Sequence, residues 1–236
     1  MATKITQPIS INGEGKTVVI NGFDFTESGY VRVSNAAEVT IINCRIFNLS
    51  KDPDSTTSKG YWFKTFGDKE TKITINNCFF GSNSGTIYNM LELNTKLKDG
   101  SSISNNYFVE DSCTHNRINI YGADENATIE INNNIFEFTD GERIGIKGEP
   151  VCTLNYKNNT VIKTATDKWA GLICIQPYGK ETKSFKNMTV NIENTTIPSE
   201  QIGYYYIGSS DTSLSSEESK GKIYVNGVLT ILPLLQ

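Results

Sequence analysis

The chain has 236 residues, enough for one large domain with a buried hydrophobic core. Its 22 Lys and Arg against 26 Asp and Glu give a net charge of −4 without any dense basic run, which argues against nucleic-acid binding through phosphate neutralisation. The apolar stretches are too short to cross a bilayer, and the start MATKITQPIS lacks a signal-peptide pattern. We therefore expect a protein made in a cytoplasm, with neither nucleic acid nor membrane as a partner.

An apolar, alternating segment recurs along the chain and predicts one β-strand at each occurrence. In chain order these segments are SIN (10–12), VRV (31–33), YWFKTF (61–66), MLELN (90–94), INIYG (118–122), IGIKG (144–148), LICIQ (172–176) and YYYIG (204–208). In five successive copies, an Asn-containing segment follows after a nearly constant distance of 10 to 12 residues. The variable length therefore falls after the Asn-containing segment.

Asparagine marks a second repeated segment, and the chain contains 25 asparagines in all. Six copies read TIINCRIF (40–47), TINNCFF (74–80), SISNNYF (102–108), EINNNIF (130–136), NYKNNTV (155–161) and NIENTTI (191–197). Their shared asparagines are Asn43, Asn77, Asn105, Asn133, Asn158 and Asn194. Gly22 and Gly227 fill the same slot in two further copies, which suits a bend with positive φ. Each of the eight units is thus predicted as strand, connection, strand, two-residue bend and strand.

One such unit cannot bury its own apolar face, but units stacked at about 4.8 Å would pair in parallel around a continuous core. On these repeats the chain resembles the right-handed parallel β-helix (pectate-lyase-like) superfamily, and is most like a bacteriophage virion-associated β-helix protein. The resemblance implies an all-β fold, a right-handed parallel β-helix solenoid of about eight rungs with a ladder of stacked asparagines. A β-sandwich is the alternative, although its hairpin signals would recur every eight to twelve residues.

The six shared asparagines are the structural ladder in this interpretation. If their amides are buried, replacing Asn105 or Asn133 with Ala should destabilise the fold by about 1 to 3 kcal/mol.

We expect a single domain over 1–236. Within it, 1–8 form a lead-in, the Ser- and Glu-rich 209–222 an exposed loop, and 223–236 a terminal strand with an apolar tail. The tail GVLTILPLLQ is either a strand docked on its own core or an attachment surface.

The cysteines are Cys44, Cys78, Cys113, Cys152 and Cys174, without CxxC spacing, so the sequence predicts neither a disulfide framework nor a zinc site. Cys44 and Cys78 occupy the slot that Asn106, Asn134 and Asn159 fill in later copies. They should therefore be neighbours on adjacent rungs. The rung spacing permits a disulfide, but two free thiols are the preferred interpretation.

Few residues point to catalysis, and no cofactor or metal site is predicted. The outward positions of the first strands are Arg32, Lys64, Glu92, Asn119, Lys147 and Gln176. Glu92 is the only carboxylate among them, whereas a glycosidase needs two. The remaining candidates are interpreted as surface or packing residues: His115, the carboxylates Asp24, Glu130, Glu137, Asp140 and Glu142, and the aromatics Tyr61, Trp62, Tyr121, Trp169, Tyr178, Tyr204, Tyr205 and Tyr206. The aromatic residues could alternatively bind sugars.

The fold resemblance favours a non-enzymatic structural virion protein, capsid-decorating or fibre-like, that is made in a bacterial host cytoplasm and lies on the virion surface. Its expected partners are other virion proteins or further copies of itself, a trimer for example, with a surface glycan as another candidate. The alternative is a carbohydrate-active, tailspike-like depolymerase with Glu92 as its first candidate residue, or a glycan-binding β-helix.

Overall fold

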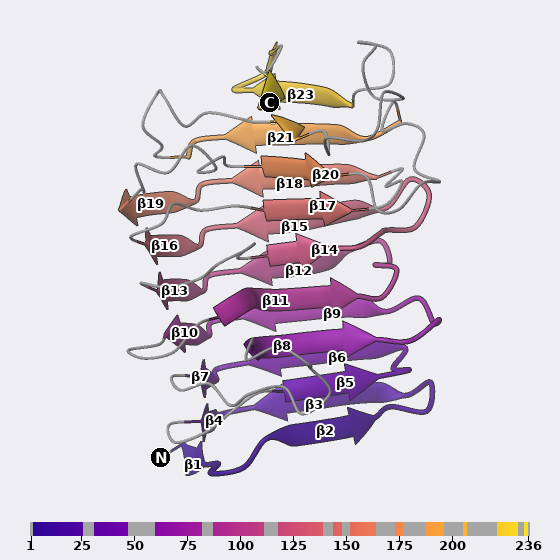
Figure 1. Ribbon diagram of the computed structural model, residues 1–236, viewed down its shortest axis with the longest axis vertical. Helices are drawn as coiled ribbons and strands as arrows, with labels where there is room; N and C mark the ends of the chain where they lie inside the picture. The colour runs from indigo at the N-terminus through magenta and orange to yellow at the C-terminus, as the bar shows by residue number, and fades with distance from the viewer. Residues whose placement is uncertain are drawn as a thin grey trace.

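The described residues of the computed structural model contain β-strands and no helix (Figure 1). The structure describes residues 2–25, 31–46, 60–81, 87–110, 118–138, 144–147, 152–163, 173–176, 187–195, 205–206, 221–230 and 234–235. Within this part of the chain, no helix is long and apolar enough to span a membrane.

Three long sheets make up the fold. Sheet 1 contains, in spatial order, β2 (Ile9–Asn12), β5 (Val31–Ser34), β8 (Gly60–Phe66), β11 (Ile87–Asn94), β14 (Ile118–Ile120), β17 (Ile144–Lys147) and β20 (Ile173–Gln176). Sheet 2 contains β3 (Thr17–Asn21), β6 (Glu38–Ile42), β9 (Lys72–Asn76), β12 (Ser101–Ser104), β15 (Thr128–Asn132), β18 (Thr153–Lys157), β21 (Thr189–Glu193), β23 (Lys222–Val225) and β24 (Val228–Leu229). Sheet 3 contains β1 (Thr3–Lys4), β4 (Phe23–Phe25), β7 (Arg45–Ile46), β10 (Phe79–Gly81), β13 (Tyr107–Glu110), β16 (Ile135–Phe138) and β19 (Thr160–Lys163).

The order of the strands shows a solenoid-like winding. From β2 to β19 the chain visits sheets 1, 2 and 3 in turn, and each strand from β2 to β18 pairs in parallel with the strand three later in the sequence. Figure 1 shows the resulting stack, with the N-terminus at one end and β23 at the other. The expected all-β architecture of parallel strands is confirmed, whereas a β-sandwich would require antiparallel Greek-key sheets.

The alternation of residues explains why sheet 2 is regular. In β6, Val39 and Ile41 point inward and are fully buried, whereas Thr40 between them is partly exposed. The same burial pattern recurs in β9, β15, β18 and β21, and the register places equivalent residues beside one another. β-branched residues suit such half-buried, pleated positions.

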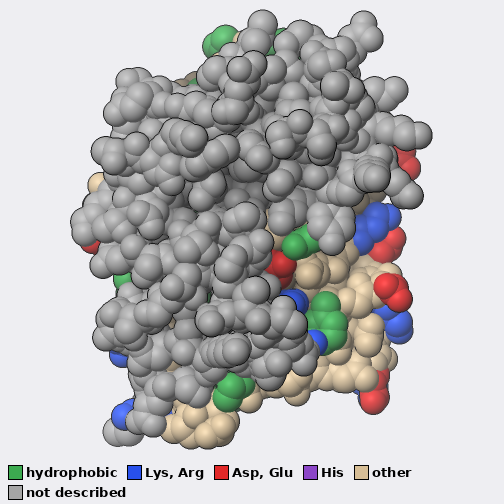
Figure 2. Space-filling view, in the orientation of Figure 1, with side chains coloured by type: hydrophobic (Ala, Val, Ile, Leu, Met, Phe, Trp, Pro, Cys, Tyr) green, Lys and Arg blue, Asp and Glu red, His purple; other side chains and the backbone are tan. Residues whose placement is uncertain are grey.

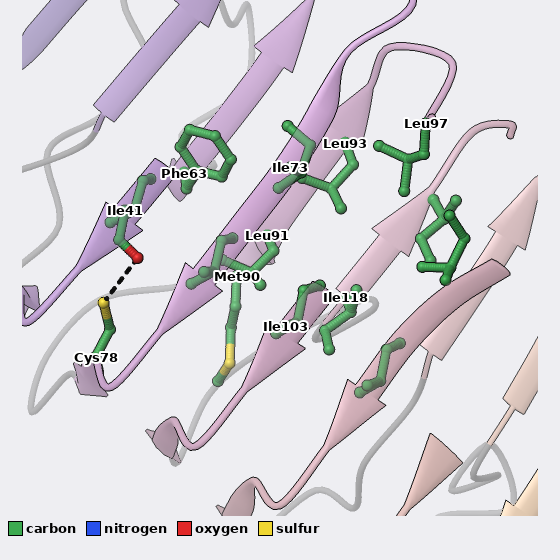
Figure 3. Packing of buried hydrophobic residues seen from close by; sticks show 14 of the residues in the cluster. Ile41, Phe63, Ile73, Cys78, Met90, Leu91, Leu93, Leu97, Ile103 and Ile118 are labelled. Carbon is green, nitrogen blue, oxygen red and sulfur yellow. Dashed lines mark hydrogen bonds between the residues drawn. The ribbon is translucent and has the colours of Figure 1, made fainter. Parts of the chain in front are cut away.

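The core consists of side chains stacked from coil to coil. Figure 3 shows Leu91 and Met90 of β11 close to Ile103 of β12 and Ile118 of β14. In sheet 3, the ring of Phe108 lies 4.9 Å from those of Phe80 and Phe136, nearly parallel to both. Trp62 stacks on Phe80 at 5.8 Å and is fully buried, so it is a packing residue and offers no surface to a sugar.

The bend between sheets 2 and 3 uses the left-handed backbone conformation. The residues with positive φ there are Gly22 (74°), Asn43 (55°), Asn77 (53°), Asn105 (58°), Asn133 (57°), Asn158 (56°) and Asn194 (48°). Asn and Gly tolerate this conformation best, which explains their recurrence at a fixed place in each unit.

The C-terminal end departs from the expectation that Gly227 forms one more bend of this kind. Asn226 and Gly227 both have positive φ, at 48° and 79°, and β24 turns back to pair antiparallel with β23. Two successive residues with positive φ form the tight type I′ hairpin turn, which reverses the strand instead of turning it into sheet 3.

Other parts of the termini also form strands. In the lead-in 1–8, β1 pairs in parallel with β4, and near the C-terminus β25 (Leu234–Leu235) pairs with β22 (Tyr205–Tyr206). The end of the apolar tail thus lies against its own chain, whereas Val228 and Leu229 are 67% and 58% exposed. Most of the predicted loop 209–222 lies outside the described residues; its last residue, Lys222, begins β23.

Candidate functional site

The six asparagines predicted as a ladder lie in register at the bend, and all six are exposed. Some of their side chains are hydrogen-bonded: Asn77 Nδ2 donates to Asn43 Oδ1 at 2.7 Å, and Asn105 Nδ2 donates to Asn76 Oδ1 at 2.8 Å. Their amides are nevertheless on the outside, because a left-handed residue at the bend directs its side chain away from the core while the next residue points inward.

The buried amide ladder is therefore one residue further along the chain, at Asn106, Asn134 and Asn159, which are 2% exposed or less. Asn134 Nδ2 donates to Ile103 O at 2.9 Å and to Asn159 Oδ1 at 3.0 Å. Asn134 Oδ1 accepts from the backbone N and from Nδ2 of Asn106, both at 3.0 Å. Asn134 thus links three successive coils, and Asn106 does the same through Cys78 N, Ile75 O and Asn134 Oδ1.

Cys44 and Cys78 extend this column toward the N-terminus, as predicted from their slot in the repeat. Both are free thiols in this structure. Cys78 Sγ donates to Ile41 O at 3.6 Å, the bond drawn in Figure 3, and Cys44 Sγ donates to Ile20 O at 3.6 Å. These bonds correspond to the one from Asn134 Nδ2 to Ile103 O, because each reaches the carbonyl of an inward-pointing residue on the preceding coil.

The thiols lie at the edge of an outer groove of about 490 Å³ that runs along the bend. Its lining also includes four of the bend asparagines, Asn106 of the internal ladder, and the side chains of sheet 3 that face outward: Arg45, Phe79, Tyr107 and Ile135. The rings of Phe79 and Tyr107 stack on each other at 5.7 Å, so each covers a face of the other.

A second candidate site is the outward face of sheet 1, where Glu92 of β11 was predicted. The register places Arg32, Lys64, Glu92 and Asn119 side by side on successive strands. Glu92 is only 2% exposed; its Oε2 accepts from Asn119 Nδ2 at 2.9 Å and its Oε1 from Tyr121 OH at 2.8 Å. Asn119 is also buried, so these predicted outward positions are not solvent-exposed.

The other two predicted outward residues of sheet 1 lie in a neighbouring column. Lys147 is the register partner of Gln176, whereas the partners continuing from Asn119 are Gly145 and Cys174. Neither position adds a carboxylate beside Glu92.

Two of the other carboxylates singled out in the sequence, Glu130 and Glu137, accept hydrogen bonds from neighbouring coils. Glu130 Oε1 accepts from Asn155 Nδ2 at 2.6 Å, and Glu137 accepts from the Tyr107 hydroxyl, which raises the pKa of that phenol. Asp24 is the register partner of Arg45. His115, Asp140, Glu142, Trp169, Tyr178 and Tyr204 lie outside the described residues, as does the side chain of Tyr61.

Charged side chains of both signs occur together on the described surface. Figure 2 shows them along one edge of the N-terminal half, and the ion pairs of the described residues include Lys96 with Glu70 and with Asp124, each at 3.1 Å. Neighbouring Glu70 and Asp124 raise the pKa of Lys96. No group of three His, Cys, Asp or Glu residues suited to a metal ion occurs in the described ranges.

No family model, curated protein or solved structure matches this chain.

Proposed function

We propose that this chain is a right-handed parallel β-helix of about eight coils that serves as a non-enzymatic structural protein and docks on a larger assembly such as a virion. In this role it decorates a capsid or forms part of a fibre. The rod is a scaffold whose rigidity comes from stacked coils, the internal amide ladder and the aromatic column of sheet 3.

The environment of Glu92 is the observation that carries the non-enzymatic assignment. Hydrolysis of a glycosidic bond needs two carboxyl groups about 5 to 10 Å apart, one as acid and one as base or nucleophile. The register partners of Glu92 on the two adjacent strands are Lys64 and Asn119, and both carboxylate oxygens accept hydrogen bonds. Among the described residues of this column, Glu92 therefore has a structural contact on each oxygen and no second acid beside it.

A turnover assay on bacterial polysaccharides tests this assignment. We expect the wild-type chain to release no more reducing ends than buffer, and Glu92→Gln to behave identically. Measurable turnover by the wild-type chain that disappears in Glu92→Gln would instead establish the tailspike-like depolymerase. Circular dichroism of both proteins provides the control that the variant is folded.

The terminal hairpin supports the docking part of the proposal. Val228 and Leu229 are highly exposed on β24, which forms the last strand of sheet 2, and exposed apolar residues on an edge strand favour association. In this proposal the hairpin binds another protein of the assembly. In the purified chain, where that partner is absent, we expect the same exposed apolar residues to cause self-association.

Light scattering over a concentration series measures the self-association of the purified chain. We expect the apparent molar mass of the wild-type chain to rise with concentration, and that of Val228→Ser/Leu229→Ser to stay near 26.2 kDa. Ile162→Ser is the matched control, because Ile162 is an apolar residue 53% exposed on the side of the rod. If the control suppresses association as strongly as the double variant, the hairpin is not the docking surface.

A glycan-binding β-helix is the second candidate, and the groove along the bend favours it. The groove combines exposed amides with Arg45 and the hydroxyl-bearing Tyr107, which are groups that hydrogen-bond sugars. Calorimetric titration with surface polysaccharides tests this function, and binding that is lost in Arg45→Ala would support it.

A further inference from the structure

Two cysteines come together at the edge of the groove. Cys44 immediately precedes β7 and Cys78 immediately precedes β10, and these strands pair in parallel with Arg45 opposite Phe79. The same register places Cys44 opposite Cys78, so their Cα atoms are about 4.8 Å apart, within the range that a disulfide spans. Their inward side chains belong to one column, and both thiols donate to backbone carbonyls of the preceding coil, Cys44 to Ile20 O and Cys78 to Ile41 O.

The surroundings of Cys44 favour its thiolate. The neighbouring Cys78 thiol, with smaller contributions from the backbone of Phe23 and Gly22, outweighs the effect of burial and lowers the pKa of Cys44 to about 7. The same thiol–thiol contact and burial raise the pKa of Cys78. Arg45, the next residue in the chain, lines the groove beside both cysteines. A low thiol pKa and access from an outer groove are typical of reactive cysteines.

Cys152 shows what an inert thiol in the same fold looks like. It is as buried as the pair, at 4% exposed, but burial alone raises its pKa to about 12. It is absent from the lining of the groove, whereas Cys44 and Cys78 both belong to it. Cys152 therefore serves as the reference against which the reactivity of Cys44 and Cys78 can be compared in the same protein.

We propose that Cys44 and Cys78 form a peroxide-reactive dithiol site that closes into a disulfide between the second and third coils. The Cys44 thiolate attacks one oxygen of hydrogen peroxide; an S–O bond forms, the O–O bond breaks, and the released hydroxide takes up the proton that Cys44 had lost. The Cys78 sulfur then attacks the Cys44 sulfenic acid; the S–S bond forms, the S–O bond breaks, and the leaving hydroxide takes the Cys78 proton. In total, two thiols are oxidised, one peroxide is reduced and two waters are released.

Tryptic peptide mapping tests the cross-link directly, because each of the five cysteines falls in a different tryptic peptide. After the folded protein is treated with hydrogen peroxide, we expect peptides 33–45 and 73–96 to be joined with loss of two hydrogens, and the Cys152 peptide to keep its free thiol. The cross-link closes a long loop, so Tm should rise by about 5 to 10 °C and fall again with reductant. Three results would overturn the proposal. They are oxidation of Cys44 to sulfinic acid without a cross-link, a cross-link to another cysteine, and a Cys44–Cys78 pair that stays reduced.

A second variant keeps the test independent of folding defects. Cys78→Asn places the ladder residue of later coils in the same slot, so the variant is expected to fold and, under peroxide, to show no rise in Tm. Cys152→Ala is the matched control and should retain both the cross-link and the rise. A rise in Tm that persists in Cys78→Asn would contradict the assignment to this pair.

Discussion

Replacement of Asn134 by Ala is expected to lower the free energy of unfolding by about 3 to 4 kcal/mol, measured by denaturant titration. The amide of Asn134 takes part in hydrogen bonds with Asn106, Asn159 and Ile103 on its two neighbouring coils. Its removal takes a hydrogen bond from each of these residues and leaves the buried backbone N of Asn106 without the acceptor it has in this structure. An unsatisfied buried polar group costs more than the net value of one hydrogen bond.

Asn133 provides the matched control, since it is the adjacent residue on the same bend but is exposed. Asn133→Gly should change the stability very little, because Gly adopts the φ of 57° found there without strain. Equal losses in Asn134→Ala and Asn133→Gly would contradict the separation into an outer bend and an inner ladder.

Replacement of Phe108 by Ala should have a still larger effect, about 3 to 5 kcal/mol. The ring of Phe108 is fully buried and stacks at 4.9 Å on both Phe80 and Phe136, so its loss opens a cavity in the middle of the aromatic column. Phe108→Leu refills much of that volume, so it should lower the free energy of unfolding by less. The remaining loss reflects the absence of ring stacking.

The control for this prediction is Tyr107→Leu, in the same strand. Tyr107 faces outward, stacks on Phe79 and is partly exposed, so its replacement should cost less than about 1.5 kcal/mol. If both substitutions in β13 cost the same, the alternation of inward and outward side chains in that strand is not as the structure has it.

The repeat made the strands and their order predictable. Each unit has an inward apolar residue at every second position and Asn or Gly at a fixed place. Parallel stacking of the units places these equivalent residues on top of one another, so the pattern predicts that arrangement. The pairing of Cys44 with Cys78 followed from the same frame and is confirmed by the register.

The choice between Asn133 and Asn134 as the buried amide needed the backbone. Both belong to the run of three asparagines in EINNNIF, and only the positive φ of Asn133 shows that its side chain turns outward. A signal was present in the sequence, because Cys44 and Cys78 replace Asn at the second position, and cysteine is a residue that prefers burial.

The terminal hairpin and the burial of Glu92 also escaped prediction. The pair Asn226-Gly227 is typical of a hairpin turn, but it fits the bend of the repeat equally well. Only the antiparallel pairing of β24 with β23 shows that it forms a hairpin turn. Strand alternation correctly places Glu92 on the outer side of sheet 1, yet it does not reveal the contacts with Asn119 and Tyr121 that hold its carboxylate.

The stacking of coils in register is the central claim, and distances between spin labels on the outer face of sheet 2 test it most directly. Thr17, Thr128, Thr189 and Lys222 share one column, with Thr128 four coils from Thr17, Thr189 six coils and Lys222 seven coils away. Dipolar spectroscopy on pairs labelled at Thr17 and each of the others should therefore give backbone separations of about 19, 29 and 34 Å, in proportion to the number of coils. Separations that do not increase in this proportion would contradict the stacked-coil fold and the function proposed from it.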